Sequence, residues 1–177
     1  MRPSQWNTLV AGLLLTPIPY IGHAETYLTE DQAAAVLFPG VKLEARWMEL
    51  TPAEIKTITK MSGEKPLSSR TRVFWGPDHE ALFIDRVLGK HEFITYAAAI
   101  NADGTVKGIE IMDYRETYGY QVREAAWREK FVGKSTADPL QLDKDIPNIS
   151  GATLSSKHIA NGMRRLLHTY ALLKTRL

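Results

Sequence analysis

The order of apolar and polar residues predicts two short helices at the start of the chain. Thr29-Glu30-Asp31-Gln32 and Thr51-Pro52-Ala53-Glu54 each place threonine at an N-cap, with Gln or Glu three positions later. The first sequence predicts a helix over residues 31–37, which Pro39-Gly40 ends. The second predicts a helix that ends at Gly63. The polar residues that follow, 64–70, are expected to form a loop.

Residues 71–112 change to a strand pattern. Strands are predicted over residues 73–75, 81–88, 92–100 and 106–112, with turns at Gly89-Lys90 and at Asn101-Ala102-Asp103-Gly104. Short connections favour antiparallel neighbours, so we expect an α+β fold. Its core would be an antiparallel β-meander covered on one face by helices.

Helical spacing returns near the end of the chain. Residues 124–132 are predicted to be helical, with Trp127 and Phe131 on one face as core side chains or as a wall of a ligand pocket. Residues 154–173 form a longer amphipathic helix, and its apolar stripe consists of Ile159, Met163, Leu166, Leu167, Tyr170 and Leu173.

Composition narrows the possible chemistry. The chain has 177 residues, a net charge of +2 and no cysteine. One domain is expected from this length, and disulfides, iron–sulfur ligation and cysteine-attached haem are excluded. The sequence has no long basic run, so it does not indicate nucleic acid as a partner. The scattered histidines lack metal-ligand spacing, and no Gly-x-Ser-x-Gly sequence indicates a hydrolase.

The first 24 residues are typical of a secretory signal peptide. Arg2 precedes a short apolar segment at residues 9–15, and Gly22-His23-Ala24 provides small residues at the expected cleavage site. Because the apolar segment is shorter than the roughly 20 residues of a membrane span, we expect cleavage after Ala24 and a periplasmic protein. The alternative is an uncleaved N-terminal membrane anchor.

The sequence before the long helix, Ile149-Ser150-Gly151-Ala152-Thr153-Leu154-Ser155-Ser156, combines small residues with hydroxyls. A helix start favours a phosphate because its backbone N–H groups are unpaired and its macrodipole is positive there. Gly151 and Ala152 leave room for the phosphate, and the N–H groups of residues 153–156 are expected to face it. Additional hydrogen bonds or charge would come from Ser150, Ser155, Ser156 and Lys157. The alternative is an ordinary N-cap at Ser150 or Thr153, with Leu154 starting the apolar stripe and Lys157 solvated.

Residues 150–153 resemble the S/T-G-A-T signature of the FMN-binding domain family. This family includes flavoprotein subunits of the Rnf and sodium-pumping NADH–quinone reductase complexes, and the resemblance covers roughly residues 82–173. In many members a flavin transferase esterifies FMN onto the last threonine, which implies attachment at Thr153. The usual aspartate three residues before the signature is Pro147 here. Either Asp145, just upstream with Asp143, fills that role, or FMN binds without a covalent bond.

A second segment, Glu116-Thr117-Tyr118-Gly119, resembles the E-T-P-G loop of the same family, with Tyr118 in place of proline. The resemblance implies that Glu116, Thr117 and Gly119 contact the flavin. Tyr118 and Tyr120 are candidates to stack on its ring, or else they pack in the core. Arg115 would stabilise a reduced anionic flavin, or else it forms a surface ion pair with Glu116 or Glu124.

The resemblance implies a periplasmic flavoprotein that carries electrons. Residues 25–70 would be an N-terminal helical segment and residues 71–177 the FMN-binding domain. Maturation would need a flavin transferase, and electrons would pass to and from a membrane or periplasmic redox partner. Two alternatives stay open: a subunit of a membrane electron-transport or flavin reductase complex, and a non-redox binding module. The sequence leaves open whether the protein turns over a substrate itself.

Overall fold

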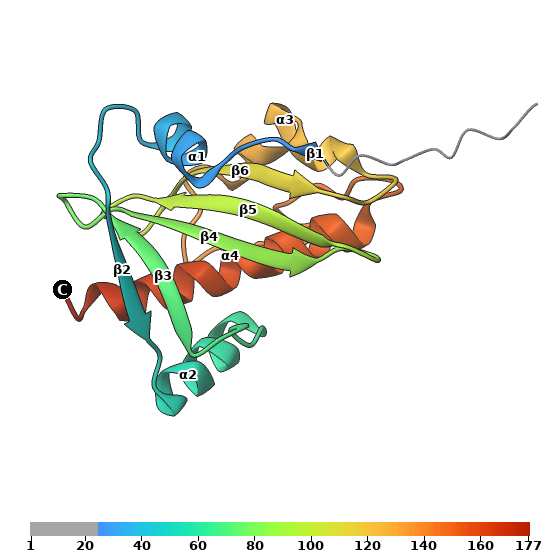
Figure 1. Cartoon of the computed structure of the whole chain (residues 1–177). Coiled ribbons are helices and arrows are strands. Elements are labelled where there is room, and N and C mark those ends of the chain that lie inside the picture. The colour runs from blue at the N-terminus through green and yellow to red at the C-terminus, as the bar shows by residue number, and fades with distance from the viewer. Residues whose placement is uncertain (1–24) are drawn as a thin grey trace, which may run out of the picture.

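A computed structural model describes residues 25–177, so the predicted signal peptide lies outside the described residues. The fold is built on one antiparallel sheet of six strands in the order β1-β6-β5-β4-β3-β2 (Figure 1). The strands are β1 (Glu25–Thr26), β2 (Glu44–Glu49), β3 (Arg70–Trp75), β4 (Ala81–Leu88), β5 (Phe93–Ile100) and β6 (Val106–Tyr114). The predicted α+β class and the antiparallel meander from β3 to β6 are therefore confirmed.

The two edge strands were not predicted. Strand β2 pairs only with β3 and is exposed along nearly its whole length, so its residues Glu44–Glu49 lack the apolar alternation of a half-buried strand. Strand β1 has two residues, which pair with Asp113 and Tyr114 of β6. Both strands form because a neighbouring strand offers backbone partners, a signal that local sequence does not carry.

The first two helices start at the predicted capping boxes. Helix α1 (Glu30–Leu37) begins after Thr29, whose N–H donates to Gln32 Oε1 at 2.9 Å. Helix α2 (Pro52–Ser62) begins after Thr51, whose N–H donates to Glu54 Oε2 at 2.7 Å. Gly63, at φ +76°, ends α2 in the left-handed conformation that glycine adopts without strain.

Helices cover both faces of the sheet, which corrects the prediction that only one face is covered. The long helix α4 (Thr153–Lys174) lies along one face together with α2, whereas α1 lies on the other (Figure 1). Strand side chains alternate between the faces, and those on the α1 side, such as Leu82, Ala97 and Ala99, are also buried. The continuous apolar run at residues 97–100 is what a strand covered on both faces requires.

The segment between β6 and α4 contains only short helical turns. These are the 3₁₀ turn η1 (Tyr120–Arg123), α3 (Ala125–Arg128) and the 3₁₀ turn η2 (Glu129–Phe131), where one helix was predicted. Trp127 and Phe131 are buried with ring centroids 5.0 Å apart, which confirms them as core side chains. Trp127 Nε1 also donates to the Pro147 carbonyl at 2.8 Å, so this core holds the loop that leads to α4.

Within residues 25–177, no helix has the length and apolar character needed to cross a bilayer.

Candidate functional site

A cleft of about 360 Å³ lies at the N-terminal end of α4, and we call it the α4 cleft. Three segments meet there: the β4–β5 turn, the loop after β6 and the start of α4. The lining residues are Lys90, His91, Glu116, Thr117, Tyr118, Gly151, Ala152, Thr153, Leu154 and Ser155. The cleft therefore brings together the two segments that the sequence singled out.

The start of α4 leaves three backbone donors free. Its N-cap is Ala152, and no side chain caps the helix, so the ordinary N-cap expected at Ser150 or Thr153 is not formed. The N–H groups of residues 153–155 have no acceptor among the described residues, whereas the Ser156 N–H donates to the Ala152 carbonyl at 2.9 Å. Three donors, not the expected four, are thus available to an anion beside the exposed Thr153.

Close contact fixes the loop after β6 against α4. A Cβ on Gly119, which lies at φ +94°, would overlap both the Ala152 Cβ and the Tyr114 hydroxyl. That hydroxyl donates to the Tyr118 carbonyl at 2.5 Å and lies 3.3 Å from Ser155 Oγ. Burial raises the pKa of Tyr114, although its hydrogen bond with Ser155 acts in the opposite direction, so the phenol stays protonated as a donor.

Glu116 joins the loop after β6 to the β4–β5 turn. Its Oε1 accepts the His91 N–H at 2.6 Å and the Glu92 N–H at 3.1 Å. Partial burial raises the pKa of this carboxyl, but the backbone N–H groups of residues 90–92 outweigh that effect and hold the pKa below its usual 4.5. The ionised side chain thus positions the turn that carries two lining residues, Lys90 and His91.

A comparison with known families agrees with this geometry. Residues 89–168 match the model of the FMN-binding domain family. This segment belongs to the FMN-binding domain family. The match contains all ten residues that line the α4 cleft, and it indicates FMN as the cofactor. No match to a curated protein is found.

The residues of the α4 cleft fit the phosphate end of FMN. Three free N–H groups and the positive end of a helix 22 residues long would hold a phosphate, and Lys90 adds a positive charge. Tyr118 and Leu154 are 77% and 43% exposed, so both offer uncovered apolar surface to the isoalloxazine ring. The alternative predictions, that Tyr118 and Tyr120 pack in the core and that the buried apolar stripe starts at Leu154, are therefore wrong.

Several predicted site residues of the FMN-binding domain do not line the cleft. Ser150 and Lys157 are exposed, and Tyr120 is 62% exposed. Ser156 is fully buried, and its Oγ has no partner among the described residues. Arg115 pairs with Asp113 at 2.9 Å, neither with Glu116 nor with Glu124 as the alternative predicted. Gly119 does not line the cleft itself, but it packs against Ala152, which does.

Sequence reasoning missed Lys90 and His91. In the sequence they belong to a tight turn between two strands, and a turn by itself indicates no ligand. Only the sheet, which brings this turn beside the loop after β6, places them in the cleft.

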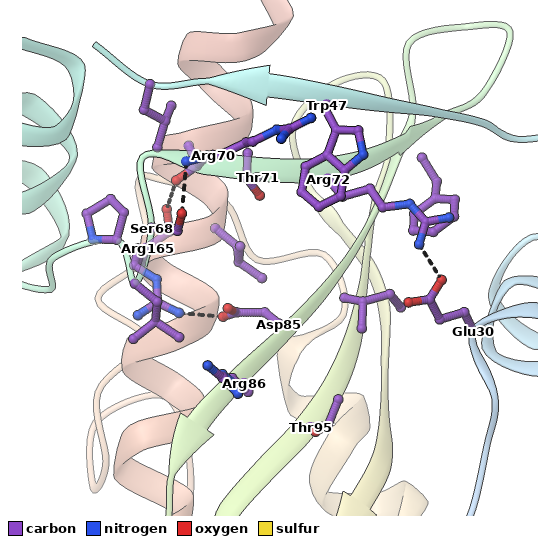
Figure 2. Close-up of a pocket in the computed structure, with 17 residues that line it drawn as sticks. Glu30, Trp47, Ser68, Arg70, Thr71, Arg72, Asp85, Arg86, Thr95 and Arg165 are labelled. Atoms are coloured by element: carbon purple, nitrogen blue, oxygen red, sulfur yellow. Dashed lines mark hydrogen bonds and ion pairs between the residues drawn. The ribbon is translucent and has the colours of Figure 1, made fainter. Parts of the chain in front are cut away.

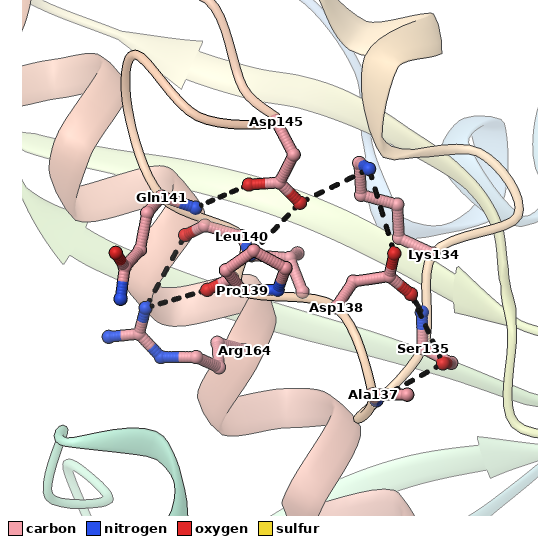
Figure 3. Close-up of polar contacts among 9 residues, drawn as sticks. All are labelled: Lys134, Ser135, Ala137, Asp138, Pro139, Leu140, Gln141, Asp145 and Arg164. Carbon is pink, nitrogen blue, oxygen red and sulfur yellow. Dashed lines mark hydrogen bonds and ion pairs between the residues drawn. The ribbon is translucent and has the colours of Figure 1, made fainter.

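Asp145 has a structural role in the loop before α4 (Figure 3). Its carboxylate accepts the Gln141 N–H at 2.8 Å and the Leu140 N–H at 3.1 Å, and lies 3.1 Å from Lys134 Nζ. Burial raises its pKa, but these partners outweigh burial and keep the pKa below 3.8. None of the three partners lines the α4 cleft, so these contacts of Asp145 support the loop before α4.

Proposed function

We propose that this protein is an exported flavoprotein electron carrier that holds FMN covalently, through a phosphoester with the Thr153 hydroxyl. The observation that carries the proposal is the position of Thr153. It is the first residue of α4, its side chain is exposed, and it lies in the cleft where the two flavin-family segments meet. A flavin transferase would form the ester, and a membrane or periplasmic redox partner would exchange electrons with the flavin.

The residues of the cleft have distinct tasks in this proposal. The N–H groups of residues 153–155 and the helix macrodipole stabilise the charge that a phosphoester retains. Glu116 holds the β4–β5 turn so that Lys90 faces the same cleft. FMN, when bound, supplies the one- or two-electron chemistry, and the protein orients it and tunes its potential.

The test is the intact mass and visible spectrum of the full chain, produced and exported together with a flavin transferase. We expect the mass of one esterified FMN and a flavin band near roughly 450 nm that survives acid precipitation. Thr153→Ala should lose the added mass, because it lacks the hydroxyl that forms the ester, whereas Thr153→Ser should retain it. Thr57→Ala, at an exposed threonine of α2, is the matched control.

Other results would contradict parts of the proposal. Flavin that acid releases from the wild type would refute the ester and leave a non-covalent FMN protein. A colourless protein would refute the electron-carrier role. Mature protein that remains in the cytoplasm would refute export.

A further inference from the structure

The central sheet divides between β3 and β4. These strands pair only at Val73–Trp75 with Ala81–Phe83. Beyond that point, residues 70–72 of β3 pair with β2, and residues 84–88 of β4 pair with β5 (Figure 1). The separation holds a cleft of about 390 Å³, which we call the β3–β4 cleft. It shares no lining residue with the α4 cleft and has the size of a small-molecule site.

A buried cation forms the floor of the β3–β4 cleft. Arg165, in the middle of α4, is only 6% exposed, and its Nη2 donates to Asp85 Oδ2 (Figure 2). The same Oδ2 accepts the Tyr96 hydroxyl at 2.6 Å. No other acceptor for the guanidinium is found among residues 25–177. Arg165 therefore keeps N–H donors that Asp85 does not use, and these unused donors can bind an added acceptor.

Two further arginines lie at the cleft without a carboxylate partner. Arg70 and Arg86 are exposed, and neither forms an ion pair within the described part of the chain. Arg72 is the fourth arginine, but it pairs with Glu30 at 2.8 Å (Figure 2). Four arginines thus line one cleft in which Glu30 and Asp85 are the only carboxylates among the lining residues. The Arg86 guanidinium also lies over the Phe93 ring, 4.8 Å from its centroid.

Apolar side chains form part of the wall of the β3–β4 cleft. Trp47 of β2 is 58% exposed and lies under the Arg70 guanidinium, 4.4 Å from it. Phe74, Ile84 and Leu67 continue this surface. An exposed indole beside unpaired guanidinium groups suits a ligand with both a flat apolar body and an anionic group.

We propose that the β3–β4 cleft is a second ligand site, separate from the flavin site, that binds a small organic anion. The carboxylate or phosphate of the ligand binds Arg70, Arg86 and Arg165, and its apolar body packs on Trp47. Guanidinium groups bind both anions through paired hydrogen bonds. Binding would also relieve the repulsion among arginines that lack carboxylate partners.

Calorimetric titration of the full chain with four probes tests this site. The probes 1-naphthoate and 1-naphthyl phosphate share an apolar body and differ in the anion. Inorganic phosphate lacks the body, and 1-naphthalenemethanol lacks the charge. We expect both naphthyl anions to bind at least about tenfold more tightly than the other two. 1-Naphthalenemethanol lacks the charge-assisted hydrogen bonds, and inorganic phosphate lacks the apolar surface that would be buried on Trp47. The tighter of the two identifies the anion class.

Variants decide where the probes bind. Arg70→Gln and Arg86→Gln should each weaken binding of the naphthyl anions about tenfold or more. Arg46→Gln removes an exposed arginine beside Trp47 that does not line this cleft, so it should leave the affinity unchanged. The indole N–H resonance of Trp47 should shift on binding in the wild type.

Three results would overturn the proposal. The first is no binding of either naphthyl anion at millimolar concentration. The second is binding that Arg70→Gln and Arg86→Gln leave unchanged. The third is equal binding of 1-naphthalenemethanol, which would show an apolar surface without an anion site. None of these results depends on whether FMN is attached at Thr153.

Discussion

At the scale of single residues, the small size of Gly119 and Ala152 allows the loop after β6 to pack closely against the start of α4. The family resemblance implied that Gly119 contacts the flavin, and Ala152 was expected to leave room for the phosphate, whereas the structure places the two residues against each other. Position 119 requires glycine for two reasons. Its φ of +94° is unfavourable for other residues, and a side chain there has no space. The sequence could predict that these positions are small, but not which atoms make the small size necessary.

Gly119→Ala should destabilise the protein more than Gly133→Ala. Gly133 lies at φ +79°, and a Cβ added there would have no atom within 4 Å, so its substitution costs only backbone strain, about 1–2 kcal/mol. Gly119→Ala has a similar strain plus overpacking against Ala152 and Tyr114, about 1–3 kcal/mol more. The free energies of unfolding in denaturant measure the difference. Equal values for the two variants would contradict the contact.

At the scale of elements, the helices have strong local sequence signals and were predicted. The edge strands have no such signal and were not predicted. The capping boxes at Thr29 and Thr51 and the stripe of α4 are local, so they were visible in the sequence. Strand β2 is exposed and polar, and the β4–β5 turn carries no sign of a ligand. Hydrogen bonds from the backbone of this turn to Glu116, which lies in the loop after β6, position the turn at the cleft.

Glu116 should make stability depend on pH in the acidic range. Its pKa is lower in the folded protein than the usual 4.5, so the ionised form stabilises the fold. This contribution is complete above the unfolded-state pKa and is lost as pH falls through the folded-state pKa. Glu116→Gln should therefore lose less thermal stability than the wild type when pH falls from 6 to 3. Parallel pH profiles of melting temperature would refute this role of Glu116.

At the scale of the whole molecule, α4 connects the core to the site. Its first turn lines the α4 cleft, and its middle supplies Arg165 to the β3–β4 cleft. Between these points Ile159, Ala160 and Met163 are buried against the sheet. The packing of one helix on the sheet thus positions residues of both clefts.

Truncation of that face should affect the whole fold. Ile159 is fully buried in the main core, so Ile159→Ala should lower the free energy of unfolding by about 2–5 kcal/mol. Met61→Ala, at a side chain of α2 that is 58% exposed, should change it by less than about 0.5 kcal/mol. Chemical denaturation of the flavin-free protein measures both changes. A small loss for Ile159→Ala would show that α4 does not depend on this contact.

The sequence by itself determined the α+β class, the meander from β3 to β6, the helix starts and the two segments that meet in the α4 cleft. Each of these depends on neighbours within a few residues: alternation, capping and short motifs. Tertiary structure alone decided that helices cover both faces, that Lys90 and His91 join the cleft, and that Asp145 supports a loop. It also decided that the sheet divides between β3 and β4. These features depend on contacts between segments far apart in the chain, and the periodicity of one segment does not encode where another will lie.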